Sequence, residues 1–483
     1  MGAINGRDYI NRIDQLHNEI WYDGEKIVGP LSEHPAFRGL IQSKAALYDL
    51  QHDPNIKDEM TFVSPVSGEA IGLSFLQPKT KEDLRRRRKM TEHWARYSGG
   101  IMGRSPDYLN TVLMSFASSA NFLTTKENCF PKNLQAFFEL ARENDLSFTH
   151  TFISPQVNRS PIYIENSDEP IAAKVVDKNE DGIIVKGARL LATQGGLTDE
   201  VLVFSVGKFL FNEDQAFAFS IPSNTKGIKF ICRDTFIGGQ SSFDHPLSSR
   251  FDEMDSIIVF DNVLVPWDRV FYYNNTEVAE EFPFHSPFHH YAKHQVLTRQ
   301  IVKTEFVLGI AELLIETIKI GGYQHVQDKM SEIIIGLETM KALLEKSENN
   351  AEVDEWGYMR PEIFPLQVAG NIFPKIYPRF TEIIQLIGAS GMIILPTEKA
   401  FHSSIQKDLD SYLRGATKTA EERVKIFRLA WDLTMSSFGT RQTQYERYFF
   451  GDPIRMASDL YGKYPKIEYV QVVSNFLNLN REE

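Results

Sequence analysis

The stretch S-F-T-H-T-F-I-S-P-Q-V-N-R, residues 147–159, marks the point where the hydrophobic pattern of the chain changes. Within it, aromatic residues and His150 alternate with threonines, and alternation of period two predicts a β-strand. His150 and Phe152 should therefore face the same side of that strand. An imidazole beside aromatic rings, followed by a turn of hydrogen-bonding groups, suits a buried site for an aromatic ligand. The alternative is a core histidine whose nitrogens are satisfied.

The patterns on either side of this stretch divide the chain into three parts. Before residue 147, apolar residues recur at helical spacing, beginning after Asn5, which can cap the first helix. Short alternating runs then predict strands at 171–176, 182–186, 201–206, 216–221, 227–231 and 257–260. Later the helical period returns, with helices predicted at 299–320, 324–348, 378–386 and 420–437. We expect an α+β protein with an N-terminal helical domain (1–146), a middle β-barrel or sandwich domain (147–274) and a C-terminal helical bundle (275–483).

Composition restricts the class of partner. The 483 residues carry a formal charge of −12, which argues against nucleic acid or an anionic membrane as the main partner. The only cysteines, Cys129 and Cys232, give neither a disulfide framework nor a cysteine metal site. No apolar run approaches the roughly 18 residues of a membrane span, so we expect a cytoplasmic protein. The C-terminal helices carry more apolar surface than one chain easily covers, which predicts an oligomer.

A second candidate site begins at a helix start. Ser105 can cap a helix that starts at Pro106, which places Arg104 and Tyr108 on the same side, one turn apart. A guanidinium and a phenol together can hold a phenolic oxygen or a carboxylate and stabilise developing negative charge. An arginine at a helix start with a tyrosine one turn later is also ordinary packing.

Two turns carry groups that suit a flavin. In the turn after the quoted strand, Gln156, Asn158 and Arg159 offer amide and guanidinium groups to a pyrimidine edge and a diphosphate. Loop hydrogen bonding explains them equally well. Thr193, within G-A-R-L-L-A-T-Q-G-G (187–196), either bonds a ring nitrogen or belongs to a plain hairpin.

Other motifs exclude further classes. His289, His290 and His294 include an i, i+4 pair, but no third ligand is spaced to complete a metal site, so we expect no metal and assign them a surface or interface role. The basic run 81–89 predicts a solvated helix face, with a phosphate site as the weaker alternative. Phosphate-loop, Rossmann and nucleophile-elbow motifs are absent. A flavin would therefore not be bound as in pyridine-nucleotide oxidoreductases.

Five motifs together resemble the 4-hydroxyphenylacetate 3-hydroxylase family, the large oxygenase components of two-component monooxygenases that use a diffusible flavin. They are M-G-R-S-P-D-Y (102–108), T-H-T-F-I-S-P-Q-V-N-R (149–159), K-G-A-R-L-L-A-T (186–193), F-D-N-V-L-V-P-W-D-R-V (260–270) and Y-E-R-Y-F-F-G-D-P (445–453). The first two are specific, and the match spans nearly the whole chain in order. The resemblance implies an acyl-CoA dehydrogenase-like fold with a flavin between the middle domain and the bundle.

The resemblance also implies the roles of particular residues. The family surrounds the substrate's phenolic oxygen with groups that map to Arg104, Tyr108 and His150. A loop over the substrate maps to Ser205 and Val206, and because some relatives have polar pairs there, the exact phenol stays open. The positions carried over as FAD contacts are His150, Gln156, Val157, Asn158, Arg159 and Thr193. A C-terminal segment also reaches FAD, with Arg441, Gln442, Gly451 and Asp452 as its candidates.

The implied activity is ortho-hydroxylation of a phenol. FADH2 from a separate flavin reductase would react with O2, and oxygen would reach the ring through a C4a-hydroperoxyflavin. The expected reaction converts 4-hydroxyphenylacetate to 3,4-dihydroxyphenylacetate, in a homotetramer. Alternatives are a family member acting on another phenol or an aminobenzoate, an acyl-CoA dehydrogenase-type enzyme with a catalytic glutamate, and a non-enzymatic scaffold. The 4-hydroxybutyryl-CoA dehydratase branch is excluded, because its iron–sulfur cluster requires three cysteines.

Overall fold

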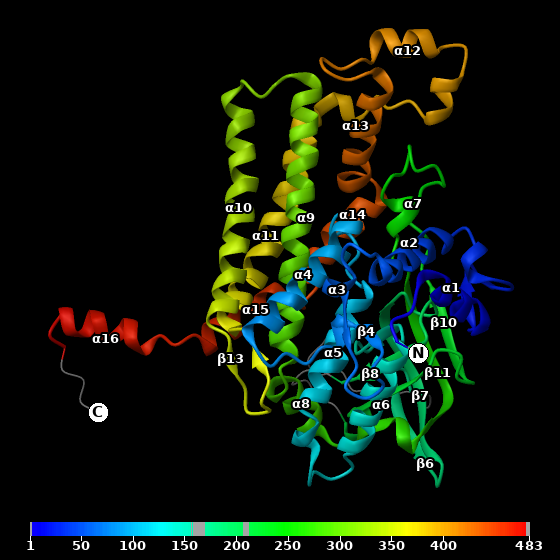
Figure 1. Ribbon diagram of the computed structural model, residues 1–483, viewed down its shortest axis with the longest axis vertical. Helices are drawn as coiled ribbons and strands as arrows, with labels where there is room; N and C mark the ends of the chain where they lie inside the picture. Colours follow the sequence, from blue (N-terminus) through cyan, green and yellow to red (C-terminus); the bar gives the residue numbers. More distant parts are fainter. Residues whose placement is uncertain (1, 156, 158–169, 206–211, 480–483) are drawn as a thin grey trace.

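Three long helices form a column beside two β-sheets in the computed structural model (Figure 1). The structure describes residues 2–155, 157, 170–205 and 212–479. The column consists of α9 (Phe288–Ile318), α10 (Gln324–Asn349) and α11 (Ile363–Gly388), which pack against one another. The apolar positions of α10, spaced by three and four, are buried along one seam, as predicted. The helical bundle expected after residue 275 is therefore confirmed.

Six helices precede the first strand of the middle region and cover one side of the sheets. They are α1 (Gly6–Gln15), α2 (Arg38–Asp49), α3 (Lys57–Met60), α4 (Lys81–Tyr97), α5 (Pro106–Ser118) and α6 (Pro131–Asn144). Asn5 caps α1 through a capping box, as predicted. Helix α5 starts at Pro106 as expected, but Ser105 does not cap it, because its hydroxyl donates to Asp107 Oδ1 at 2.5 Å instead. Every residue of α5 is buried, so the helix presents its first turn firmly to the interior.

The strands form one six-stranded and one four-stranded sheet. The larger has the order β2-β1-β10-β11-β7-β6 and the smaller β12-β9-β8-β5. Their bounds are β1 (Ile20–Tyr22), β2 (Glu25–Lys26), β5 (Phe148–Thr151), β6 (Lys174–Lys178), β7 (Gly182–Thr193), β8 (Glu200–Phe204), β9 (Phe217–Pro222), β10 (Ile228–Cys232), β11 (Asp255–Pro266) and β12 (Val270–Tyr273). Two small hairpins add β3 (Thr61–Val63) with β4 (Ala70–Gly72), and β13 (Glu352–Val353) with β14 (Met359–Arg360).

The middle region was predicted to be a β-barrel or a sandwich. The prediction of a barrel is wrong, because the two sheets of the described residues do not close into one. They pack face to face, with the rings of Phe219 and Phe260 in edge contact at 6.2 Å. One isolated bridge, Ile153 to Leu190, joins the sheets along one side. A period of two is common to barrels and sandwiches, so the sequence pattern could not separate them. The larger sheet also includes β1 and β2 from the first 146 residues, and the predicted domain boundaries stay a prediction.

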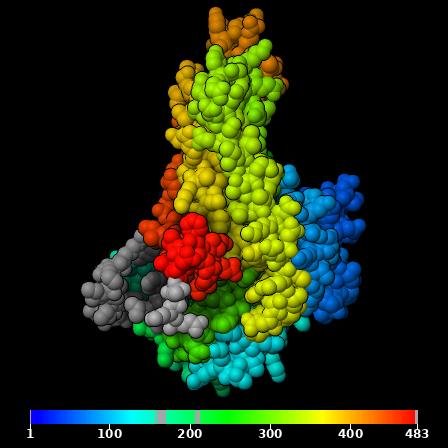
Figure 2. Space-filling model, turned by 90° about the vertical axis from the view of Figure 1, so that its left-hand side faces the viewer, coloured from blue at the N-terminus to red at the C-terminus, as the bar shows by residue number. Residues whose placement is uncertain are grey.

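The remaining helices surround the column and extend beyond it. They are α7 (Ser248–Phe251), α8 (Thr276–His285), α12 (Gln406–Tyr412), α13 (Ala420–Thr434), α14 (Ser437–Tyr448), α15 (Pro453–Lys463) and α16 (Ile467–Phe476). The helix predicted to begin at Pro378 begins at Ile363, with two prolines inside it. Figure 1 shows α16, drawn in red, projecting from the body of the molecule, and in Figure 2 the same helix lies on the face turned toward the viewer. No helix of the described residues is long and apolar enough to cross a membrane.

Candidate active site

The structure brings Arg104, Tyr108 and His150 together. Arg104 and Tyr108 come from the start of α5, and His150 lies on β5, the edge strand of the smaller sheet. The guanidinium carbon of Arg104 lies 4.5 Å from the ring centroid of Tyr108, and that ring lies 6.0 Å from the ring of His150. Three chemically different groups thus meet where the N-terminal helices contact the four-stranded sheet.

His150 sits in an aromatic shell. Its ring stacks on Phe204 at 5.8 Å and lies 5.3 Å from the ring of Phe152, so the shared face predicted for His150 and Phe152 is confirmed. Burial, and then the nearby charge of Arg104, hold the pKa of His150 well below 6.5. The imidazole is therefore neutral at pH 7. Its buried Nδ1 has no hydrogen-bond partner among the described residues.

Arg104 is held by aromatic rings from both ends of the chain. Its guanidinium carbon lies 4.5 Å from the ring centroid of Phe449 as well as that of Tyr108. Its Nη1 donates to the hydroxyl of Tyr445 at 2.6 Å. Sequence reasoning did not select Tyr445 or Phe449, although both lie in the motif at 445–453. Their spacing of four residues, which places Tyr445 and the C-cap residue Phe449 on one side of α14, is the signal that could have identified them.

A buried carboxylate connects the three chain segments that form the site. Glu253 accepts hydrogen bonds from the backbone N–H groups of Gly103 (2.8 Å) and Arg104 (2.7 Å). It also accepts from Gln194 Nε2 at 3.0 Å and lies 3.8 Å from Arg441. Glu253 is fully buried, so these donors replace the water that a carboxylate otherwise requires. It fixes the backbone that carries Arg104 relative to β7 and α14.

Two of the predicted flavin contacts, Thr193 and Arg441, meet at one carboxylate. The Thr193 hydroxyl donates to Asp255 Oδ1 at 2.8 Å, and Arg441 Nη2 donates to the same oxygen at 2.9 Å. Gln442, the next residue, is fully buried and accepts from Lys303 Nζ at 2.9 Å. The end of β7 and the middle of α14 are therefore adjacent, as a flavin bound between sheet and bundle would require.

The other predicted positions are less informative. Gln156, Asn158, Arg159 and Val206 lie outside the described residues. Val157 is exposed. Ser205 is buried, and its hydroxyl donates to the carbonyl of Gln215 at 2.7 Å. Asp452 accepts from the N–H of Ile454 and caps α15, and Gly451 before it has φ +105°.

Several buried polar atoms around this site have no hydrogen-bond partner among the described residues, although one of them, Arg441 Nη1, lies 3.8 Å from Glu253. They are Arg104 Nε, His150 Nδ1, Gln194 Oε1, Arg441 Nη1 and Gln442 Nε2. Leaving such an atom unpaired costs about 1–3 kcal/mol, so their concentration here indicates a polar ligand. The set offers donors and acceptors from the helical, sheet and bundle parts of the chain. It therefore fits a ligand with a polar heteroaromatic ring, such as a flavin.

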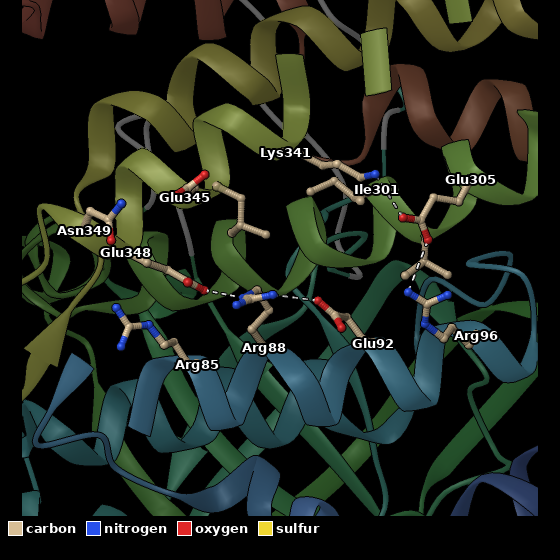
Figure 3. A pocket seen from close by; sticks show the side chains of 12 residues that line it. Arg85, Arg88, Glu92, Arg96, Ile301, Glu305, Lys341, Glu345, Glu348 and Asn349 are labelled. Carbon is tan, nitrogen blue, oxygen red and sulfur yellow. Dashed lines mark hydrogen bonds and ion pairs between the residues drawn. The ribbon is translucent and has the colours of Figure 1, made fainter. Parts of the chain in front are cut away.

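A separate charged cavity lies between α4 and the pair α9 and α10 (Figure 3). Its volume is about 370 Å³. Arg88 pairs with Glu348 and with Glu92, each at 2.9 Å, and Arg96 lies 3.3 Å from Glu305. Because glutamates neutralise these arginines, the cavity does not favour a phosphate.

The basic run at 81–89 is also not wholly solvated, since Arg87 is buried and donates to the carbonyl of Ser74 at 2.7 Å.

The histidine cluster of α9 is not a surface feature throughout. His294 is buried and its Nε2 lies 2.9 Å from Glu348, so it is not a surface residue, and the interface role stays a prediction. His290 Nδ1 bonds the carbonyl of Pro361 at 2.8 Å. Among the described residues, no three histidine, cysteine or carboxylate groups are placed to hold a metal.

Comparison with solved structures defines the class. The chain superposes on butyryl-CoA dehydrogenase from Megasphaera elsdenii with a TM-score of 0.50 at 13% identity, covering 95% of this chain and 97% of that one. With an archaeal 4-hydroxybutyryl-CoA dehydratase from N. maritimus the TM-score is 0.88 at 19% identity, with 99% and 96% of the two chains covered. At these identities the likeness concerns the fold alone. The protein has the acyl-CoA dehydrogenase-like fold, with its candidate site where sheet, helices and bundle meet.

The chain belongs to the 4-hydroxyphenylacetate 3-hydroxylase family. Models of the family's N-terminal and C-terminal parts match residues 5–272 and 279–478. A probable 4-hydroxyphenylacetate 3-monooxygenase of Bacillus subtilis is 63% identical over 482 residues, which is 100% of both chains. The corresponding oxygenase component of Thermus thermophilus is 44% identical, covering 98% of this chain and 97% of its own. A crystal structure of such a component, complexed with FAD and 4-hydroxyphenylacetate, superposes with a TM-score of 0.94 at 44% identity and covers 99% and 98% of the two chains.

Proposed function

We propose that this chain is the oxygenase component of a two-component flavin monooxygenase that hydroxylates 4-hydroxyphenylacetate ortho to its hydroxyl, giving 3,4-dihydroxyphenylacetate. The observation that carries the proposal is the meeting of Arg104, Tyr108 and His150 within one buried aromatic shell. Family membership and the FAD and 4-hydroxyphenylacetate in the related crystal structure support the same reaction. Reduced FAD, when bound, supplies the activation of O2 that the protein's own side chains lack.

The protein's groups would act on the phenol's oxygen. Neutral His150 accepts the phenolic proton or a hydrogen bond from it at Nδ1, which makes the ring electron-rich. The fixed guanidinium of Arg104 stabilises the resulting negative charge. Burial raises the pKa of Tyr108, so its hydroxyl stays protonated and donates a further hydrogen bond. The surrounding phenylalanines exclude water, which strengthens each of these interactions.

The acyl-CoA dehydrogenase alternative requires a glutamate that removes a proton from carbon. The two buried glutamates nearest the site do not suit that role. Glu446 is clamped by Arg299 at 2.7 Å and Lys303 at 2.8 Å, and these cations outweigh burial and lower its pKa to about 2. Glu253 is occupied by backbone amides. No observation on the described residues favours this alternative over the hydroxylase.

A substrate panel tests the proposed reaction. Purified protein would be mixed with an NADH-dependent flavin reductase, FAD and one phenol at a time, and product formed per NADH would be measured. We expect coupled turnover with 4-hydroxyphenylacetate and little with phenol, chlorophenols or aminobenzoates. Coupled turnover of another phenol in preference would correct the substrate, and no hydroxylation of any phenol would overturn the function. Colourless protein after purification would also fit a flavin that diffuses between two components.

The proposal includes a flavin reductase as partner, a cytoplasmic setting and a homotetramer. The strongest support for self-association is α16, where only Ser474 is buried. Its exposed apolar side chains include Ile467, Val472 and Phe476, each more than half exposed. An apolar helix held away from the body of its own chain indicates a surface that a second copy covers (Figure 1).

Removing this helix should lower the oligomeric state. A chain ending at Pro465 loses α16 but keeps the column and both sheets, so we expect its mass in solution to fall from four chains to two or one. Sedimentation velocity measures the change directly. A full-length control with Gln471→Ala, a polar position on the same helix, should keep the parent mass. Identical masses for the truncated and full-length proteins would remove α16 from the interface.

A further inference from the structure

A buried ion network joins α9 to α14 next to the candidate active site. Glu446 on α14 accepts two hydrogen bonds from the guanidinium of Arg299, at 2.7 and 3.1 Å, and one from the ammonium of Lys303 at 2.8 Å. Gln300 Nε2 donates to the same carboxylate at 3.2 Å. The side chain of Arg299 is 1% exposed, and those of Lys303 and Glu446 are fully buried. We call Arg299, Lys303 and Glu446 the Glu446 network.

The Glu446 network reaches the loop that leads into Arg104. Arg299 Nη1 also donates to the carbonyl of Gly100 at 2.8 Å. Gly100 has φ +72°, and a Cβ there would lie 2.6 Å from the backbone nitrogen of Lys303. Only glycine therefore allows the loop to approach α9 so closely. The loop is thus held against α9 four residues before Arg104.

The network also holds α14 at two positions one turn apart. Lys303 Nζ donates to Gln442 Oε1 at 2.9 Å as well as to Glu446. A helix held at two positions on one side cannot slide or rotate about its axis without breaking both contacts. Tyr445, directly before Glu446, carries the hydroxyl that accepts from Arg104 Nη1 at 2.6 Å. The contacts of Lys303 therefore help to fix where this hydroxyl lies.

Arg104 and Arg299 contact the same two aromatic rings. The guanidinium carbon of Arg299 lies 5.9 Å from the ring centroids of both Tyr445 and Phe449. The guanidinium carbon of Arg104 lies 5.6 Å from the first and 4.5 Å from the second. The two rings therefore connect the Glu446 network to the guanidinium that would hold the phenolic oxygen.

We propose that Arg299, Lys303 and Glu446 are positioning residues, which hold α14 and the loop at Gly100 so that Arg104 meets the phenolic oxygen. The inference rests on the proposed function and adds to it three residues that act through Tyr445 and Phe449. Stability alone does not account for the network, because buried ion pairs are often no more stabilising than apolar side chains of similar volume. What apolar side chains could not supply is the set of directed hydrogen bonds that fixes the loop and the helix together.

Two variants weaken the network and leave Glu446 a cation. Lys303→Met keeps the pair of Arg299 with Glu446 and removes the contact with Gln442. Arg299→Lys keeps the charge but loses the planar fork that also reaches Gly100. We expect each variant to fold and to lower kcat for 4-hydroxyphenylacetate about 10-fold, because a hydrogen bond that positions the substrate-binding guanidinium is weakened. An unchanged kcat in Arg299→Lys would mean that only the charge matters, which overturns the proposal.

A double-mutant cycle tests whether the effect passes through Arg104. In the Arg104→Met background, adding Lys303→Met should cause almost no further loss of kcat, because the group that the network positions is already absent. Losses that multiply would show that Lys303 acts independently of Arg104 and would overturn the proposal. Glu348→Gln is the matched control, because this buried carboxylate also bonds two basic side chains, Arg88 and His294, each at 2.9 Å. It should leave kcat unchanged.

The ionisation of the bound phenol gives a readout that requires no turnover. Ultraviolet absorbance distinguishes phenol from phenolate, so 4-hydroxyphenylacetate bound to the protein can be titrated with pH. We expect the bound phenol to ionise at higher pH in Lys303→Met and in Arg104→Met than in the parent, because a misplaced or missing guanidinium stabilises the phenolate less. A shift in Arg104→Met alone would contradict the positioning role. A parent protein that hydroxylates no phenol would instead refute the proposed function and the inference with it.

Discussion

Replacing His150 with alanine should keep FADH2 binding and release most of the O2 consumed as H2O2. In the proposed mechanism the neutral imidazole, which stacks on Phe204 and lies beside Phe152, accepts the phenolic proton. Without it the phenol stays protonated and its ring is a poorer nucleophile. General-base contributions are about 10²–10⁴-fold, so we expect product formed per unit time to fall by at least ~100-fold. Product and H2O2 measured per NADH consumed would separate uncoupling from lost binding.

Two comparisons sharpen this prediction. His150→Gln keeps a hydrogen-bond acceptor but no base, so it should recover affinity for the phenol without recovering the rate. His402→Ala, at an exposed position, should behave like the parent. Because the pKa of His150 is lowered below 6.5, hydroxylation by the parent should not decline as the pH falls through 6.5. Full coupling in His150→Ala would remove this residue from the mechanism.

Replacing Arg104 with methionine should reduce kcat/KM for the phenol by about 10²–10³-fold, the range observed when one stabilising group for developing negative charge is lost. The guanidinium carbon lies 4.5 Å from the ring centroids of both Tyr108 and Phe449, and Nη1 donates to the Tyr445 hydroxyl. Methionine preserves the packing volume and removes the charge. The loss should appear mainly in kcat, because the negative charge on the phenolic oxygen develops as the proton leaves.

Conservative variants distinguish charge from geometry at this position. Arg104→Lys keeps the charge, but a lysine lacks the planar guanidinium that contacts both rings, so it should rescue the activity only partly. Tyr445→Phe removes the hydroxyl that accepts a hydrogen bond from the guanidinium. We expect a smaller loss of kcat/KM, about 10-fold, because one ordinary hydrogen bond is lost. Arg96→Met removes a partly exposed arginine that lies 3.3 Å from Glu305 and should leave kcat/KM unchanged. A full rescue by lysine would show that only the net charge matters.

The sequence pattern was most informative where the local period was strong. The capping box of Asn5, the seam of α10 and the start of α5 at Pro106 were predicted from spacing and cap chemistry. The sequence pattern was less informative at Pro378. Proline is typical of a helix start, so a helix was predicted to begin there, but Pro378 lies inside α11, whose apolar face is buried by neighbouring helices. The sequence pattern also could not predict how the two sheets pack. Side-chain alternation determines which face of a strand is buried, but not how two sheets meet.

The candidate site shows the same division. Chemistry and family resemblance together selected Arg104, Tyr108 and His150 as candidates for the phenol, and the structure brings these three together. They also selected Thr193 and Arg441 as candidates for the flavin, and both bond Asp255. Neither identified Glu253, whose carboxylate binds two segments distant from it in sequence. Nothing in the residues around Glu253 distinguishes it from a surface glutamate. Its role exists only because folding removes water from it and supplies backbone donors instead.

By itself, the sequence determined the family, the order of helical and strand regions and the candidate residues for a phenol, because these depend on residue type and on spacing along the chain. Only the tertiary structure decided that the two sheets stay open and that Tyr445 and Phe449, in the C-terminal part of the chain, hold Arg104. Those features depend on distances between residues far apart in sequence. Burial and charge, which then set the pKa of His150 and the exposure of each cation, follow from those distances.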